Sequence, residues 1–254
     1  MSIIIAVSGK GGSGKTTVAS MLVRALLEHS DSGSILCIDA DPNSCLALAL
    51  GMPTGTTVAS IREFARSKPA NAGGMDRVRT FEYGLQQAIV EAGRFDLVTM
   101  GHPEGPSCYC AVNSVLRRIL DEISAKYRFV IIDNEAGMEH LSRRTTNGVD
   151  LLCVVSEPTP VGRMTAHRIL DLVRQLPIVV KRTGVLWNRS RPDDPSDDGF
   201  DVIARIPEDA QVLDASRRGE SVFSLPDDSP ALQAARAIVE PLVHANRTRL
   251  ASKC

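Results

Sequence analysis

The chain has 254 residues, of which 43% are hydrophobic and 23% charged, and its formal net charge is −1. This composition is that of an ordinary globular protein and excludes a disordered, collagen-like, coiled-coil or membrane-embedded chain. A balanced charge and 4% aromatic residues give no sign of a surface for nucleic acid or for anionic membranes. With no Gly/Ser linker in the sequence, we expect one domain over residues 1–254.

Apolar strands and helical patterns alternate along the chain. Apolar, β-branched runs predict buried parallel strands at residues 3–8, 35–39, 96–100, 129–133, 151–156 and 184–188. Helical patterns lie at residues 15–28, 58–66, 81–92, 112–126, 165–175 and 230–244, and Pro241 is expected to break the last. This order predicts an α/β fold with a doubly wound, mainly parallel sheet and helices on both faces.

The ends and loops carry fewer signals. The first apolar run is too short to span a membrane and leads into glycines rather than a cleavage site, so we expect a cytoplasmic protein. Residues 68–75 and 191–199 are rich in turn-forming residues and predict surface loops. The aspartates of the second loop lack the spacing of a calcium site, which favours a solvated excursion.

A phosphate-binding loop follows the first predicted strand. The pattern G-x-x-x-x-G-K-[ST] is complete and opens a helix, as a P-loop NTPase requires. Backbone N–H groups and the helix N-terminus can bind phosphate oxygens, Lys15 can neutralise the β- and γ-phosphates, and the Thr16 hydroxyl can bind Mg²⁺. The expected nucleotide-binding residues here are Gly9, Lys10, Gly11, Gly12, Ser13, Gly14, Lys15, Thr16 and Thr17.

A second lysine, Lys10, lies near the start of this loop. The string K-G-G-x-G-K-T resembles the deviant Walker A signature of the MinD/ParA/nitrogenase-iron-protein ATPases. The resemblance implies an ATP-driven homodimer that hydrolyses ATP to ADP and phosphate, with Lys10 reaching the nucleotide of the partner subunit. A cation there would stabilise charge on the γ-phosphate. The alternative is a solvated loop lysine.

Carboxylates follow the second and fourth predicted strands, where ligands bind in open α/β sheets. The same resemblance implies that Asp41 positions the attacking water, that Asp39 and Asp133 belong to the magnesium shell, and that Gly137 senses the γ-phosphate. The alternative for Asp39 and Asp41 is that they cap the next helix.

The adenine end of the site is expected nearer the C-terminus. The resemblance implies that Asn188 contacts the adenine base, and that Ile206 and Pro207 flank it.

Two closely spaced cysteines, Cys108 and Cys110, lie between the third strand and a helix. Near a helix N-terminus their thiols should ionise readily and bind metal. Two sulfurs make only half of a tetrahedral shell, which two copies on a dimer axis would complete. The alternatives are two small loop residues or a redox pair. Cys37 and Cys153, inside predicted strands, are expected in the core.

A closer resemblance covers nearly the whole chain. The stretch G-P-S-C-Y-C, then Asn113 and Ser114, and residues 139–143 are similar to the nickel-insertion ATPases that mature carbon monoxide dehydrogenase and acetyl-CoA synthase. This resemblance implies that Cys108 and Cys110 of each subunit bind Ni²⁺ or Zn²⁺ across the dimer, and that a nickel enzyme is the client. Thiolate ligands bind both ions, so the two cysteines do not indicate whether the metal is Ni²⁺ or Zn²⁺.

Two other classes stay open. An ATP-dependent iron–sulfur reductase takes one cysteine from the region of Cys108 and Cys110 and another from the segment after the fourth strand. In this chain that segment, residues 134–143, contains no cysteine and offers only His140. A cell-division or plasmid-partition ATPase that works on a membrane or DNA requires a basic amphipathic C-terminal helix or a stripe of basic residues on its surface. The C-terminal segment of this chain carries only scattered arginines.

Overall fold

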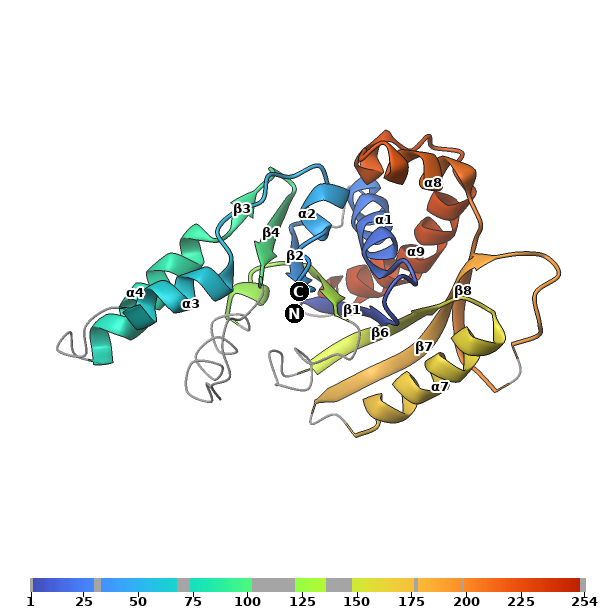
Figure 1. Cartoon of the computed structure of the whole chain (residues 1–254), viewed down its shortest axis with the longest axis horizontal. Coiled ribbons are helices and arrows are strands. Elements are labelled where there is room, and N and C mark those ends of the chain that lie inside the picture. Colours follow the sequence, from blue (N-terminus) through green and yellow to red (C-terminus); the bar gives the residue numbers. More distant parts are fainter. Residues whose placement is uncertain are drawn as a thin grey trace.

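An eight-stranded β-sheet forms the centre of the chain in the computed structural model (Figure 1). The structure describes residues 2–29, 33–67, 74–101, 122–135, 148–175, 178–197 and 199–251. The strands are β1 (Ile3–Gly9), β2 (Ile35–Ala40), β3 (Val90–Glu91), β4 (Phe95–Thr99), β5 (Phe129–Asn134), β6 (Gly148–Ser156), β7 (Val179–Ser190) and β8 (Val202–Pro207). Their order is β3-β4-β2-β5-β1-β6-β7-β8, and among these described strands only the β3–β4 pair is antiparallel. The predicted doubly wound, mainly parallel sheet is confirmed.

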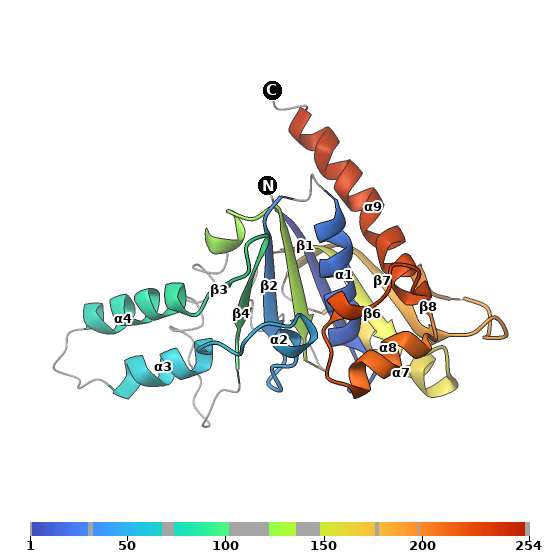
Figure 2. The same cartoon turned by 90° about the horizontal axis from the view of Figure 1, so that it is seen from above.

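Helices cover both faces of this sheet (Figures 1 and 2). They are α1 (Lys15–Glu28), α2 (Leu46–Ala49), α3 (Val58–Ser67), α4 (Gly74–Gln87), α7 (Pro160–Val173), α8 (Ala210–Arg217) and α9 (Pro230–Ala251), with a short 3₁₀ helix η1 (Val222–Ser224). Ile3, Ile5 and Val7 of β1 pack with α1 and α9, whereas Ala6 packs in the cluster on the other face, with residues of α3, α4 and α7. Burial on both faces explains why the strands are continuously apolar.

Several boundaries differ from the sequence prediction. The helix expected at residues 81–92 is α4, which begins at Gly74 and ends at Gln87, and residues 90–91 pair with β4 instead. Helix α7 begins at Pro160, because the Thr159 hydroxyl caps it by accepting a hydrogen bond from the Gly162 N–H at 3.1 Å. Strand β7 starts before residue 184, and α2, β3, β8 and α8 were not predicted.

The expected break at Pro241 is wrong. Helix α9 runs through this residue from Pro230 to Ala251. Val239 and Val243, on either side of the proline, are 0% and 3% exposed and lie in the core cluster with α1. Their burial favours a continuous helix over the loss of one backbone hydrogen bond.

The predicted loop at residues 191–199 forms no helix or strand where it is described, but it is tied to the sheet. Arg205 of β8 pairs with Asp197 and donates to the Pro195 carbonyl at 2.9 Å. Most of its described residues are nevertheless exposed, as expected of a surface loop. Of the loop predicted at residues 68–75, residues 68–73 lie outside the described part, and Gly74 and Met75 begin α4.

Two of the cysteines lie in the core, as predicted. Cys37 and Cys153 are fully buried inside β2 and β6, and burial raises the pKa of the Cys153 thiol to about 12. Both are therefore unreactive thiols at neutral pH. In the described ranges, no helix combines the length and the apolar character needed to cross a bilayer.

Candidate nucleotide site

The phosphate loop leaves the carboxyl end of β1 in the middle of the sheet. β1 lies between β5 and β6, and α1 begins directly after the loop. Because these strands are parallel, the ends of β2, β5 and β6 lie at the same edge, where Figure 2 shows α2 and α8. A ligand in the loop would therefore face side chains from several strand ends.

Close packing explains two glycines of the loop. A Cβ on Gly9 would lie 2.2 Å from the Val155 carbonyl oxygen of β6. Gly14 has φ +89°, and a Cβ there would lie 2.4 Å from Asn188 Nδ2. A side chain on Gly9 would therefore push the loop away from β6, and one on Gly14 would strain the backbone and displace the Asn188 amide.

Replacing Gly9 with Ala should therefore destabilise the nucleotide-free chain by about 2–4 kcal/mol, because the new methyl group meets a backbone oxygen. Gly11→Ala is the matched control, since Gly11 has no heavy atom within 4 Å of an added Cβ and no positive φ. Urea denaturation of both variants measures the difference. Equal stabilities would contradict the packing explanation.

The two lysines of the loop lie in different environments. The Lys15 side chain is 6% exposed, and its Nζ donates to the Lys10 carbonyl at 3.4 Å, so it folds over the inside of the loop. Lys10 is exposed. The Ser13 hydroxyl is buried and has no hydrogen-bond partner among the described residues. The loop thus presents a buried cation and an unpaired hydroxyl.

Two buried carboxylates lie next to Thr16. Asp39 and Asp133 are register partners on β2 and β5, and both are fully buried. The Thr16 hydroxyl donates to Asp133 Oδ2 at 2.6 Å, and Asp133 Oδ1 finds no partner within the described ranges. A hydroxyl beside an unpaired buried carboxylate oxygen fits the oxygen ligands that Mg²⁺ prefers, so Thr16 and Asp133 fit the predicted role.

Asp39 is already engaged by the backbone. Its Oδ2 accepts the N–H of Leu46, the first residue of α2, at 2.9 Å, and its Oδ1 accepts that of Asp41 at 3.3 Å. This contact is the helix-capping alternative considered for Asp39. Asp41 is half-buried, and its Oδ1 accepts the backbone N–H of Asn43 at 2.9 Å.

Burial raises the pKa of both buried carboxylates, and a neighbouring carboxylate adds to each shift. Burial, with a smaller contribution from the nearby Asp39, raises the pKa of Asp133 to about 7, although the Thr16 hydrogen bond and Lys15 lower it. Burial likewise raises the pKa of Asp39 to about 6, although the N–H groups of Leu46 and Asp41 lower it. The site therefore favours a cation that would offset these negative charges.

A cavity of 250 Å³ opens beside the phosphate loop, between α1, the end of β7 and α8. Asn188 and Pro207, two of the predicted adenine contacts, line it. The third, Ile206, is 1% exposed and packs in the core, so the structure does not bring its side chain to the cavity. Met21 and Leu213 form an apolar part of the cavity lining that was not predicted from the sequence. The size and mixed lining suit a nucleobase and ribose.

One carboxylate organises the outer wall of this cavity. Asp209 Oδ1 accepts the N–H of Gln211 at the start of α8 at 2.9 Å. Its Oδ2 accepts the Ser229 hydroxyl at 2.7 Å and the N–H of Ala231 in α9 at 3.2 Å. Although burial alone would raise the pKa of Asp209, these hydrogen bonds lower it. Asp209 therefore caps two helices while lining the cavity.

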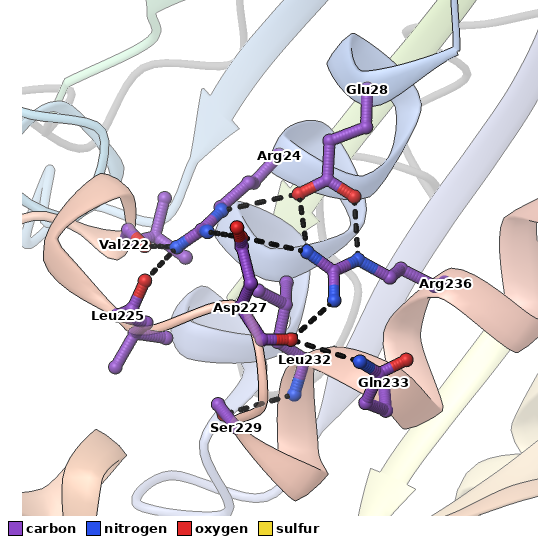
Figure 3. Close-up of polar contacts among 9 residues, drawn as sticks. All are labelled: Arg24, Glu28, Val222, Leu225, Asp227, Ser229, Leu232, Gln233 and Arg236. Atoms are coloured by element: carbon purple, nitrogen blue, oxygen red, sulfur yellow. Dashed lines mark hydrogen bonds and ion pairs between the residues drawn. The ribbon is translucent and has the colours of Figure 1, made fainter.

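Arg24 of α1 holds the segment that follows α8, as Figure 3 shows. Its Nη1 donates to the carbonyls of Val222 at 2.8 Å and Leu225 at 2.6 Å, and its Nη2 pairs with Asp227 at 2.8 Å. Arg236 of α9 joins Glu28 of α1 at 2.5 Å. The helix behind the phosphate loop and the segment after α8 are thus held together.

Residues 4–226 match the family model of the CobQ/CobB/MinD/ParA nucleotide binding domain. The chain belongs to this family of P-loop ATPases. Within the CobQ/CobB/MinD/ParA family, an uncharacterized ATP-binding protein of Methanocaldococcus jannaschii is 35% identical over 252 residues, which cover 95% of this chain and 99% of that protein. The carbon monoxide dehydrogenase accessory protein CooC of Rhodospirillum rubrum is 33% identical over 248 residues, which cover 89% of this chain and 90% of CooC.

Solved members of the CobQ/CobB/MinD/ParA family share the fold. The septum site-determining protein MinD from Pyrococcus horikoshii OT3, complexed with Mg-ADP, superimposes with a TM-score of 0.69 at 21% identity, covering 97% of this chain and 99% of MinD. A ParA family ATPase from Chlorobium tepidum TLS gives 0.70 at 19% identity, covering 93% and 98%. At these identities the likeness shows the fold, and it confirms the predicted P-loop NTPase type.

The predicted metal ligands Cys108 and Cys110 lie outside the described residues, as do Gly137 and His140. In the part of the chain that is described, no three His, Cys, Asp or Glu side chains form a group that could hold a metal ion. Cys45, which sequence reasoning left without a role, is a free, exposed thiol after β2.

Proposed function

We propose that the chain is an ATP-dependent metallochaperone. In this proposal a homodimer hydrolyses ATP, carries Ni²⁺ or Zn²⁺ between its subunits, and delivers nickel to carbon monoxide dehydrogenase or acetyl-CoA synthase. The observation that carries the proposal is the combination of a two-lysine phosphate loop with the pair Cys108 and Cys110 in one chain. The relative named as a carbon monoxide dehydrogenase accessory protein supports the client.

The nucleotide end of the proposal rests on the geometry of the loop. The buried Lys15 ammonium would neutralise the β- and γ-phosphates, and the exposed Lys10 is free to reach a partner subunit's nucleotide. Thr16 and Asp133 would hold Mg²⁺, which neutralises phosphate charge when bound. The half-buried Asp41 would orient the attacking water. Asn188 and Pro207 would contact the base.

The metal-binding part of the proposal rests on the number of thiolates that each chain supplies. Cys108 and Cys110 supply two thiolates per chain, which is half of a tetrahedral set. A dimer that closes on ATP would bring four thiolates together, and opening after hydrolysis would release the ion to the client. The metal is cargo in this scheme, so its affinity should depend on the nucleotide state.

Replacing Cys108 or Cys110 with Ala should lower bound Ni²⁺ from about one ion per dimer to none, because two thiolates cannot fill the shell. Binding of Mg-ADP should survive, since the phosphate loop is intact. Anaerobic titration with Ni²⁺ or Zn²⁺, in ADP, in ATP and without nucleotide, measures both, with the mass of the complex determined in parallel.

Cys45→Ala is the matched control, because it removes an exposed thiol outside the pair and should leave the stoichiometry unchanged. Full metal binding by both pair variants would contradict the proposal, as would a monomer that saturates with its own ion regardless of ATP. A brown protein with visible absorption after anaerobic purification would instead favour the iron–sulfur reductase.

A further inference from the structure

Two consecutive side chains at the end of β7 hold two consecutive carbonyls of the phosphate loop. Asn188 Nδ2 donates to the Ser13 carbonyl at 2.8 Å, and Arg189 Nη1 donates to the Gly12 carbonyl at 3.5 Å. In a planar trans peptide the carbonyl and the following N–H point in opposite directions. With its carbonyl held toward β7, the peptide between Ser13 and Gly14 directs the N–H of Gly14 away from β7.

Carbonyl orientation decides whether such a loop attracts or repels an anion. A carbonyl oxygen turned toward a phosphate would place negative charge against negative charge, whereas an N–H attracts it. Ser13 N–H is itself fixed by donating to the Lys10 carbonyl at 3.2 Å. The contacts from β7 therefore hold the carbonyls of Gly12 and Ser13 on the outer side of the loop.

Arg189 is in turn held by Glu157, which follows β6 directly. The same Nη1 pairs with Glu157 Oε1 at 2.5 Å. Glu157 sits on a tightly packed turn, because a Cβ on Gly162 would lie 2.0 Å from its carbonyl oxygen. Arg189 has φ +54°, an uncommon conformation for a residue with a side chain, which indicates that its surroundings fix it.

We propose that Arg189 is a positioning residue for the nucleotide phosphates, and that Glu157 acts through it. Arg189 fixes the peptide planes of the phosphate loop, and Glu157 holds the guanidinium where it reaches Gly12. The inference rests on the proposed nucleotide binding and is independent of the metal. It differs from a role in which Arg189 contacts the nucleotide itself, because in that role Glu157 would compete with the ligand.

The two roles predict opposite changes in Mg-ADP affinity for the Glu157→Gln variant. If Glu157 holds Arg189 on the loop, Glu157→Gln weakens binding of Mg-ADP, and if Glu157 competes with the ligand, the same variant strengthens it. We expect Arg189→Met to raise the Kd for Mg-ADP about tenfold and Glu157→Gln about threefold. The double variant should bind no more weakly than Arg189→Met, because Glu157 acts only through Arg189. Arg189→Lys should recover part of the loss.

Isothermal titration of the full chain with Mg-ADP measures these constants. Arg174→Met is the matched control, because Arg174 pairs with Asp171 at 2.9 Å on α7, away from the loop. Emission of Trp187, the sole tryptophan, buried next to Asn188, reports the loop independently. An unchanged Kd for Arg189→Met, tighter binding by Glu157→Gln, or additive effects in the double variant would overturn the inference. A wild-type chain that binds no Mg-ADP would overturn the proposed function, and the inference with it.

Discussion

Replacing Asp133 with Asn is expected to stabilise the nucleotide-free chain at pH 8 and to abolish its stabilisation by Mg²⁺ with ADP. Asp133 is fully buried, and its Oδ1 has no partner among the described residues. Ionising it in the folded chain is therefore unfavourable. The amide keeps the shape and removes the charge. It also removes the anionic oxygen expected to hold Mg²⁺.

The pH dependence follows from the direction of the shift. Burial raises the pKa of Asp133 from 3.8 to about 7, so the folded chain binds the proton more tightly than the unfolded chain does. The resulting stability is present below the unfolded value and is lost as the pH rises through about 7. Between pH 5 and pH 8 the wild-type chain should lose on the order of 2 kcal/mol from this group.

Urea denaturation at pH 5 and pH 8, with and without Mg-ADP, measures both effects. The variant should keep only the smaller pH dependence of Asp39, whose pKa burial raises to about 6. Asp171→Asn, which changes an exposed carboxylate of α7, should behave as the wild type. An Asp133→Asn chain with the wild-type pH dependence, or one still stabilised by Mg-ADP, would contradict this account.

Replacing Arg24 with Met is expected to cost about 3 kcal/mol of unfolding free energy, because the methionine keeps the apolar stem and loses every polar contact. Arg24 is 9% exposed, and its guanidinium satisfies the carbonyls of Val222 and Leu225 and pairs with Asp227. Without it the two carbonyls, whose hydrogen bonds to Arg24 are buried, lose a charged donor.

Arg174→Met provides the comparison, since its side chain is 78% exposed and its ion pair with Asp171 is open to solvent. Such a pair contributes about 0–1 kcal/mol. Urea denaturation at one pH compares the two variants directly. If both lose the same stability, the network between α1 and the segment after α8 is not a main source of stability.

The central strands and the phosphate loop could be predicted because their signals are local. Ile3, Ile5 and Val7 belong to an uninterrupted apolar run. Such a run is typical of a strand in a sheet that is covered on both faces. The loop is a contiguous pattern that needs no partner to be recognised. These features require only the spacing of neighbouring residues in the chain.

The C-terminal third depends on distant contacts, and there the sequence predicted β7 and α9 but missed β8, α8 and the full length of α9. Strand β8 carries Arg205 among half-buried residues, and its partners on β7 lie across the loop after residue 190. Helix α8 has only eight residues and starts at the Asp209 cap. The run of α9 past Pro241 is decided by Val239 and Val243 packing in the core. The positions of these three elements cannot be predicted from the local propensities of their residues.

The candidate site shows the same division. The identities of Lys15, Thr16 and Asp133 follow from motif and spacing. Other features depend on three-dimensional contacts that the sequence does not reveal. The backbone of α2 binds Asp39, and Ile206 is buried in the core although its neighbour Pro207 lines the cavity.

The double cap at Asp209 has a mechanical consequence. Because Asp209 is the N-cap of α8 and also binds the start of α9, the two helices cannot separate here without breaking its hydrogen bonds to the Ser229 hydroxyl and the Ala231 N–H. An outward movement of α8 would therefore displace the start of α9 as well.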